Sequence, residues 1–149
     1  MAINLDTMTI PEIFQHVSEL PASKRGHALR QIGNLMPEVK QLLKLTFHKK
    51  IKLELPEGTP PYKEMEVPKN MGLNRLPREM RKFQYFLPET NMNNIRREKI
   101  FIDLLEGLSP DEAKLVIMVK DKKLTGYKGI TRKVVEEAMP EIFDGENNV

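Results

Sequence analysis

The sequence predicts an all-α fold, a compact bundle of about six to seven short helices. Three observations indicate this class. Apolar residues recur at helical spacing, helix-forming residues and methionine are plentiful, and no long stretch alternates between apolar and polar residues as a strand does. Because 149 residues are enough for one domain with a hydrophobic core, we expect residues 1–149 to form a single domain.

The first two helices are predicted from their starts and from their apolar spacing. Thr9 and Glu12 have the spacing of a capping box, and the apolar pattern that follows continues for about three helical turns. Ser23 is expected to cap a second helix that runs to Gly33.

The third helix and the loop after it are predicted from prolines. Pro37 can open the helix, whose apolar side leads into the basic stretch His48-Lys49-Lys50-Ile51-Lys52. Residues 54–74 then contain four prolines and two glycines, which predict a long loop. Three helices are too few to bury a good core alone, so we expect this loop to lie within the domain.

The fourth and fifth helices are predicted in the middle of the chain. Pro77 can begin the fourth helix, which Pro88 ends, and residues 92–107 form the fifth. Phe83 and Phe86 share one face of the fourth helix. Core packing is therefore a better interpretation of these rings than stacking on the bases of a single strand.

The last two helices have clear starts. The sequence Ser109-Pro110-Asp111-Glu112 offers a capping serine, a proline in the first position and a glutamate in the third. Thr131 is expected to cap the seventh helix, which runs through Met139 and is stopped by Pro140. We expect residues 144–149 to form a disordered tail.

Positive charge is concentrated in three blocks of the chain. The net charge is only +3, but residues 38–53, 75–99 and 109–133 each carry a net charge of +4, whereas residues 134–149 hold five acids and no base. If the three blocks converge in the folded chain, the local field is much stronger than the net charge suggests.

The loop between the sixth and seventh helices carries the sharpest candidate site. Gly126 and Gly129 allow a tight turn and a close approach to a ligand, and Thr131 then caps a helix whose first N–H groups can bind a phosphate. Five cations surround this turn: Lys122, Lys123, Lys128, Arg132 and Lys133. The alternative interpretation of the same pattern is a helical corner with solvated lysines.

The segment from Ser109 to Met139 resembles the end of the N-terminal DNA-binding domain of ATP-dependent DNA ligases, especially the T-even phage kind. The resemblance rests on Pro110-Asp111-Glu112, on Gly126 and Gly129, and on the short helix Val134-Val135-Glu136-Glu137-Ala138-Met139 before Pro140. Three stretches near the N-terminus follow the order of that domain's first helices: Ile13-Phe14-Gln15-His16-Val17, Ser23-Lys24 and Leu42-Leu43-Lys44-Leu45-Thr46-Phe47.

The resemblance implies an all-α domain that grips duplex DNA across the minor groove through backbone phosphates. The positions that match the family's contacts are Gly126, Lys128, Gly129, Thr131 and Arg132, to which Lys49 and Lys50 add. Further candidates are Arg96, Arg97 and Lys99. The K-x-D-G motif of the ligase adenylation domain is absent from the sequence, so the resemblance implies DNA holding without ATP or nick sealing.

We therefore expect a non-catalytic protein that binds double-stranded DNA with little sequence specificity, an accessory factor of phage DNA metabolism in the host cytoplasm. No nucleotide-binding loop is present, and the histidines lack partners at metal-ligand spacing, so we expect no cofactor and no metal site. No apolar run is long enough to cross a membrane. The alternative is a protein–protein adaptor that reuses the ligase-like scaffold to bind a replication, transcription or host protein.

Overall fold

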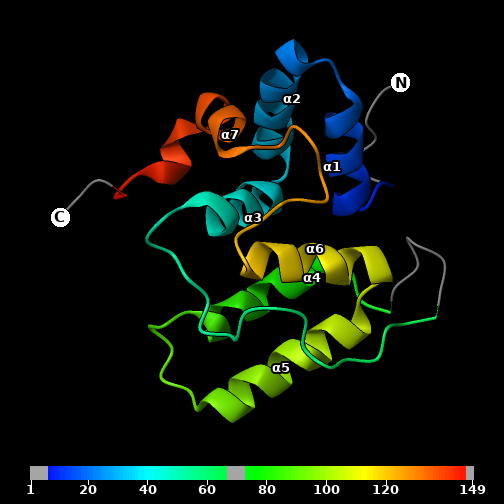
Figure 1. Cartoon of the computed structure of the whole chain (residues 1–149), viewed down its shortest axis with the longest axis vertical. Helices are drawn as coiled ribbons and strands as arrows, with labels where there is room; N and C mark the ends of the chain where they lie inside the picture. The colour runs from blue at the N-terminus through cyan, green and yellow to red at the C-terminus, as the bar shows by residue number, and fades with distance from the viewer. Residues whose placement is uncertain (1–6, 67–72, 147–149) are drawn as a thin grey trace.

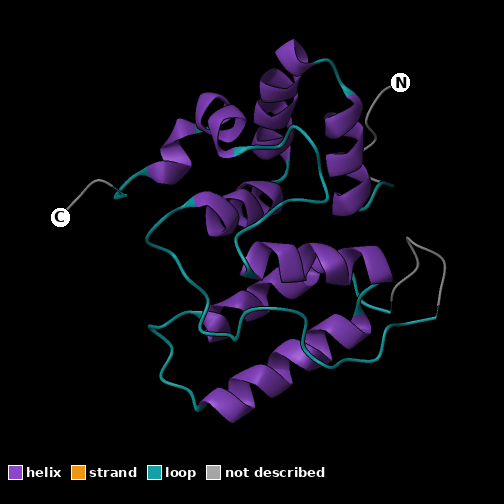
Figure 2. Ribbon diagram, in the orientation of Figure 1, coloured by secondary structure: helices purple, strands orange, loops and turns teal. Residues whose placement is uncertain are grey.

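The computed structural model describes residues 7–66 and 73–146, and within them all regular structure is helical (Figure 2), as the sequence predicts. The α-helices are α1 (Ile10–Glu19), α2 (Ala22–Leu35), α3 (Pro37–Phe47), α4 (Leu76–Glu79), α5 (Asn94–Gly107), α6 (Pro110–Lys120) and α7 (Arg132–Ala138). Two 3-10 helices follow α4 and α7: η1 (Met80–Phe86) and η2 (Pro140–Phe143). Among these residues, no helix is both long and apolar enough to cross a membrane.

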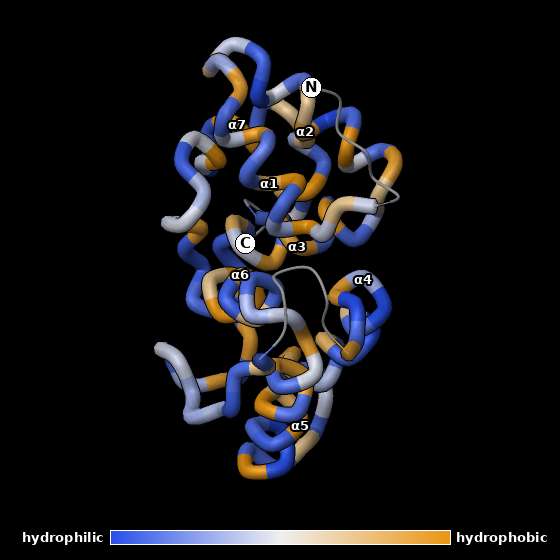
Figure 3. The backbone as a smooth tube through the Cα atoms, turned by 90° about the vertical axis from the view of Figure 1, so that its right-hand side faces the viewer, coloured by the Kyte–Doolittle hydropathy of each residue, from blue (hydrophilic) through white to orange (hydrophobic). Residues whose placement is uncertain are grey.

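The helices form an elongated bundle with α3 and α6 at its centre. Figure 1 shows α1, α2 and α7 at one end of the long axis and α5 at the other. Helix α2 packs on α3 and α7, whereas α6 packs on α1, α3 and α5. Hydrophobic and hydrophilic residues alternate in short stretches along the helices (Figure 3), so that each helix can bury one side.

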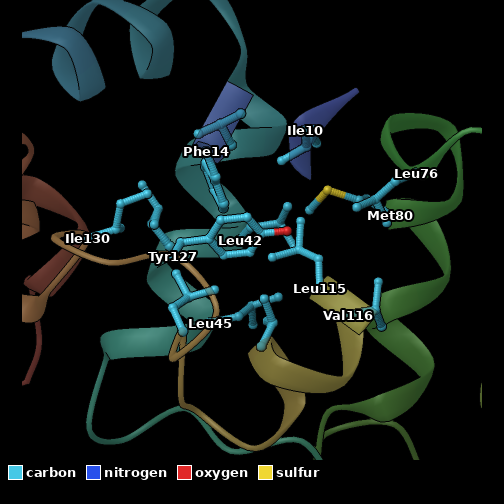
Figure 4. Close-up of a cluster of buried hydrophobic side chains, with 14 of the residues drawn as sticks. Ile10, Phe14, Leu42, Leu45, Leu76, Met80, Leu115, Val116, Tyr127 and Ile130 are labelled. Carbon is cyan, nitrogen blue, oxygen red and sulfur yellow. The ribbon is translucent and has the colours of Figure 1, made fainter. Parts of the chain in front are cut away.

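One cluster of buried side chains joins the two ends of the bundle. Figure 4 shows Phe14 of α1, Leu42 of α3 and Leu115 of α6 meeting beside Tyr127, which comes from the loop before α7. The rings of Phe14 and Tyr127 meet edge to face with centroids 5.6 Å apart. The α6–α7 loop therefore contributes its apolar residues, Leu124, Tyr127 and Ile130, to the core.

Of the four predicted helix caps, those of Thr9 and Thr131 are confirmed, whereas those of Ser23 and Ser109 are wrong. Thr9 and Glu12 form the capping box of α1, and the Thr131 hydroxyl accepts from the N–H of Val134 at the start of α7. Ser23 does not cap α2, which begins one residue earlier, after Pro21. A proline without an N–H, in an extended conformation, suits the position before a helix and displaces the start from Ser23.

The start of α6 is used differently from the prediction. Ser109 stands at the N-cap position, but its hydroxyl donates to the Glu112 carboxylate at 2.8 Å and caps no backbone group. The other Glu112 oxygen accepts from the backbone N–H of Leu76 at 3.0 Å. Because both side chains are buried, this serine–glutamate pair joins the start of α6 to the start of α4 instead of capping α6.

The predicted fourth helix is a single α-turn, α4, that continues as the 3-10 helix η1. A 3-10 helix has three residues per turn, so residues three apart lie on one face. Met80, Phe83 and Phe86 follow this spacing, and all three are buried. The rings of Phe83 and Phe86 are therefore core residues, as predicted, and offer no stacking platform for bases.

The long loop after α3 is held against α6 by a buried lysine. Residues 54–66, 73 and 74 contain no helix, as predicted, and the remaining residues of the loop lie outside the described ranges. The Lys120 ammonium donates to the carbonyls of Pro56 at 2.7 Å and Gly58 at 2.8 Å. The Asp121 carboxylate accepts from the Gly58 N–H, so both ends of this small turn are fixed.

The predicted disordered tail is partly wrong. Pro140 stops α7 as expected, but η2 follows directly and the chain is ordered through Glu146. Ile142 is buried, the His48 ring contacts the Asp144 carbonyl at 3.2 Å, and the Glu146 carboxylate pairs with Arg132. These tertiary contacts hold residues 144–146, whereas residues 147–149 lie outside the described part of the chain.

Candidate nucleic-acid interface

Lys122, a predicted DNA contact, points into the protein. Its ammonium donates to the carbonyls of Leu45 at 3.0 Å, His48 at 2.6 Å and Ile51. Burial lowers the pKa of this lysine, and Arg132 acts in the same direction against the opposing effect of Glu146. Lys122 is therefore a structural cation that satisfies carbonyls at the end of α3, and the prediction that it contacts DNA is not supported by its position.

Arg132, the second central cation of the predicted site, is also engaged within the protein. Its guanidinium donates to the Phe47 carbonyl at 2.6 Å and to the Glu136 carboxylate at 2.6 Å, and it forms two hydrogen bonds with the Glu146 carboxylate. Its carbon Cζ lies 4.4 Å from the centre of the Phe143 ring. These carboxylates raise the pKa of Arg132, and the guanidinium makes four hydrogen bonds within the protein.

The predicted turn is present, but its glycines serve internal contacts. Gly129 has a φ of +86°, and a Cβ at this position would lie 2.5 to 2.8 Å from the Arg25 guanidinium. Gly129 is therefore required by its left-handed backbone and by the close packing of Arg25. A Cβ at Gly126 would meet the Met118 sulfur at 3.1 Å. Neither close approach involves an external ligand.

Five of the six lysines of the predicted site keep exposed side chains: Lys49, Lys50, Lys123, Lys128 and Lys133. Lys123 is paired with the exposed carboxylate of Glu57 at 3.5 Å. Lys49 and Lys50 follow the end of α3, where Lys122 and Arg132 bind backbone carbonyls. The basic blocks 38–53 and 109–133 therefore converge in the folded chain. The positive surface at this convergence comes from the lysines after α3, because Lys122 and Arg132 are hydrogen-bonded within the protein.

Arg97, a further candidate from the resemblance, is buried as well. Its side chain donates to the carbonyls of Tyr85 at 2.9 Å and Thr90 at 2.8 Å and to the Asn94 side chain at 2.8 Å. It is only 4% exposed. The arginine fixes the turn between η1 and α5, and it cannot reach a ligand outside the protein.

A basic groove of about 570 Å³ lies between α3 and the turn after η1. Three lysines line it, Lys44, Lys50 and Lys52, against a single carboxylate, Glu89. The polar groups of the lining also include Gln41, Gln84 and Thr90. Lysines and amides together are the groups that proteins use on DNA phosphates and sugars. We define these six side chains and Glu89 as the basic groove.

One lysine of the basic groove, Lys50, belongs to the site predicted from the sequence, whereas Lys44 and Lys52 do not. The available signal was the charge of the segment 38–53, together with helical spacing. Gln41 and Lys44 are three residues apart and lie on the side of α3 that carries no buried residue. Polar residues at this spacing indicate a solvent-facing side of a helix, which can form the wall of a polar groove. To see that Lys44 and Lys52 line a groove, one must know where η1 and the turn after it lie, because they form the opposite wall. The sequence does not give that position.

A second groove, of about 530 Å³, has the opposite charge. It lies between α1, α6 and the α6–α7 loop and is lined by three carboxylates, those of Glu12, Glu19 and Asp111, against one lysine, Lys114. Met8 and Met118 contribute its apolar lining. We call this the acidic groove. The charges of the chain are therefore separated into a basic and an acidic concave surface, which the small net charge conceals.

Comparison with known proteins gives one match. Residues 16–126, more than half of the chain, match a family described as a family of unknown function (DUF6433). The chain belongs to the DUF6433 family. The matched region runs from the middle of α1 to Gly126, so it contains the basic groove completely and most of the acidic groove.

No curated protein matches the chain, and no solved structure matches it. Membership of DUF6433 carries no assigned activity, and the comparisons provide no link to a DNA ligase domain, so the ligase resemblance stays a prediction. Within residues 7–66 and 73–146 no group of three or more His, Asp or Glu side chains is arranged to hold a metal ion.

Proposed function

We propose that this DUF6433 chain is a non-catalytic protein that binds duplex DNA through its backbone phosphates with little sequence specificity. The observation that carries the proposal is the basic groove, where Lys44, Lys50 and Lys52 face a single carboxylate. The resemblance to ligase DNA-binding domains, set out above, supports the same function. It also supports a role as an accessory factor in phage DNA metabolism.

The proposal moves the DNA contact from the α6–α7 loop to the end of α3. Lys122 and Arg132 hold the α6–α7 loop to α3 through hydrogen bonds. The amines of the basic groove and of Lys49 lie at the surface near the end of α3. Phosphate contacts carry no base information, and the groove offers no arginine or set of amides spaced to read base edges. Weak sequence preference follows from this chemistry.

The experiment is charge reversal in the groove. We expect the double variant Lys44→Glu/Lys52→Glu to weaken binding to a 20-base-pair duplex by about tenfold or more at 0.1 M salt, measured by fluorescence anisotropy. Loss of two phosphate contacts should also reduce the slope of log K against log salt by about 2. Both side chains lie outside the buried core, so the fold should persist.

The matched control is Lys63→Glu/Lys114→Glu, which makes the same change in charge among carboxylates. Lys114 pairs with Glu64 at 3.9 Å, and Lys63 and Glu64 line one shallow hollow with Glu106. We expect the control to bind DNA within about threefold of the parent protein, because only the net charge changes. Equal losses in the two double variants would remove the groove from the proposal.

The acidic groove favours a second candidate function, a protein–protein adaptor. Its three carboxylates and two methionines suit a partner segment that combines lysine or arginine with apolar side chains, since methionine packs adaptably. A pull-down after nuclease treatment separates the two functions. A partner that is retained without nucleic acid, and lost in Glu19→Lys/Asp111→Lys, supports the adaptor. Dependence of every partner on intact DNA supports the first proposal.

A further inference from the structure

The Glu146 carboxylate occupies a site built from positively polarised donors. Two nitrogens of Arg132 donate to it, Nη1 at 3.1 Å and Nη2 by a short bond, and the backbone N–H of Lys49 donates at 3.1 Å. The Glu146 side chain is only 7% exposed although it lies near the end of the described chain. A carboxylate is thus bound by three donors at the convergence of α3, α7 and η2.

The donors around Glu146 are those that bind phosphate oxygens. A guanidinium offers two parallel N–H groups that fit a carboxylate or a phosphate, and a backbone N–H adds a third donor. The Arg132 hydrogen bonds, followed by the Lys49 N–H, lower the pKa of Glu146 to about 2, so these donors strongly favour a bound anion. A phosphate oxygen pair can replace the carboxylate oxygens one for one.

The donors are held in place without help from Glu146. The Arg132 guanidinium is fixed by the Phe47 carbonyl, the Glu136 carboxylate and the Phe143 ring. The segment carrying Phe143 is anchored by buried Ile142 and by the contact between His48 and the Asp144 carbonyl. Removal of the Glu146 carboxylate would therefore leave an ordered anion site, not a collapsed one.

We infer that Arg132 and the Lys49 N–H form a phosphate-binding site whose present occupant is Glu146, so that the chain's own carboxylate competes with an incoming phosphate group. The inference deepens the proposed function, because the DNA backbone is one source of such a group, and a free phosphate is the other. Glu146 then acts as an internal competitor. The apparent affinity for phosphate falls in proportion to the fraction of molecules in which the Glu146 carboxylate leaves the site open.

The test uses Glu146→Ala in the full chain, with inorganic phosphate and a 20-base-pair duplex as separate probes. Phosphate titration at constant ionic strength is followed by ¹⁵N NMR at the Lys49 amide and the Arg132 Nε. We expect saturable shifts at both, with an affinity at least about tenfold higher than in the parent protein. Chloride at the same ionic strength should give no saturable shift.

The matched control is Glu137→Ala, which removes an exposed carboxylate from the same helix as Arg132. Glu137→Ala should bind both probes within about twofold of the parent protein. If duplex DNA also shifts the Lys49 amide in Glu146→Ala, the DNA backbone is the source of the phosphate. Shifts with inorganic phosphate alone assign the site to a small phosphorylated ligand.

The inference is overturned if neither probe distinguishes Glu146→Ala from Glu137→Ala at the Lys49 amide. Arg132→Lys in the Glu146→Ala background gives a second readout, since a point charge cannot replace the two-pronged contact and the gained affinity should disappear. Failure of this site leaves the basic groove untouched. The Lys44→Glu/Lys52→Glu comparison, in contrast, reports on the proposed function alone.

Discussion

At the scale of single residues, three cations stabilise the fold by satisfying backbone carbonyls. Lys120 binds the carbonyls of the loop at residues 56–58, Lys122 binds those at the end of α3, and Arg97 binds one near the end of η1 and one in the turn after it. Each occupies a place where a turn or helix end leaves acceptors without N–H partners. The basic composition of the chain is thus partly a structural requirement of its irregular connections.

Replacing Lys122 tests this role directly. Lys122→Met keeps the length of the side chain but leaves the carbonyls of Leu45, His48 and Ile51 without their common donor. We expect a loss of about 2–3 kcal/mol in the free energy of unfolding, from urea denaturation at unchanged m value. Lys123→Met, one residue on and exposed, should change it by less than about 0.5 kcal/mol. Equal values for both variants would contradict the assignment.

The ionisation of Glu146 makes the free energy of unfolding depend on pH. Its pKa is about 2 in the folded chain against an ordinary value of 4.5. Because the folded-state pKa is the lower one, the ionised carboxylate stabilises the protein fully above about pH 4.5, and this contribution is lost as the pH falls towards 2. The difference in unfolding free energy between the parent protein and Glu146→Gln should therefore be constant from pH 5 to 7 and shrink towards zero near pH 2. A difference that grows on acidification would contradict the ion pair.

At the scale of elements, the proline-rich loop after α3 is anchored to the end of α6 at residues 56–58. Lys120 holds two of its carbonyls, and the Asp121 carboxylate holds the Gly58 N–H. Lys120→Met should release the turn at residues 56–58 and raise the rate of cleavage after Glu57 by a glutamate-specific protease by about tenfold, while the helices stay folded. Lys114→Met, on the exposed side of the same helix, is the control. Unchanged cleavage in Lys120→Met would show that the loop needs no such anchor.

The helices were predictable from sequence, because capping and apolar spacing are local properties. The Thr9 capping box and the Thr131 cap illustrate this. The failures involve partners distant in sequence. Ser109 has the sequence of a cap, but Glu112 instead bonds the Leu76 N–H, and Glu146 is ordered because it meets Arg132. The placement of the candidate site residues depends on the same kind of distant contact, since only the fold shows that Lys122 reaches α3 and that Lys44 and Lys52 line a groove with the turn after η1.

At the scale of the whole molecule, the separation of charge matters more than the net value of +3. The basic groove lies at the end of α3, whereas the acidic groove lies between α1 and α6. A polyanion is attracted to the first surface and repelled by the second, so it should bind in one orientation even without reading bases. In the proposed function, Lys49 and the inferred phosphate site at Arg132 would extend the contact along a duplex from the end of α3.

The salt dependence of duplex binding follows from this arrangement. If the basic groove, Lys49 and neighbouring lysines neutralise about five phosphates, released counterions should make the affinity fall roughly 10²- to 10³-fold between 50 and 200 mM salt. Two duplexes of unrelated sequence should give the same slope, because the contacts are to phosphate. Anisotropy titrations at four salt concentrations measure both quantities. A flat response would argue strongly against phosphate-mediated binding, and a steep response confined to one sequence would require base contacts that the groove does not offer.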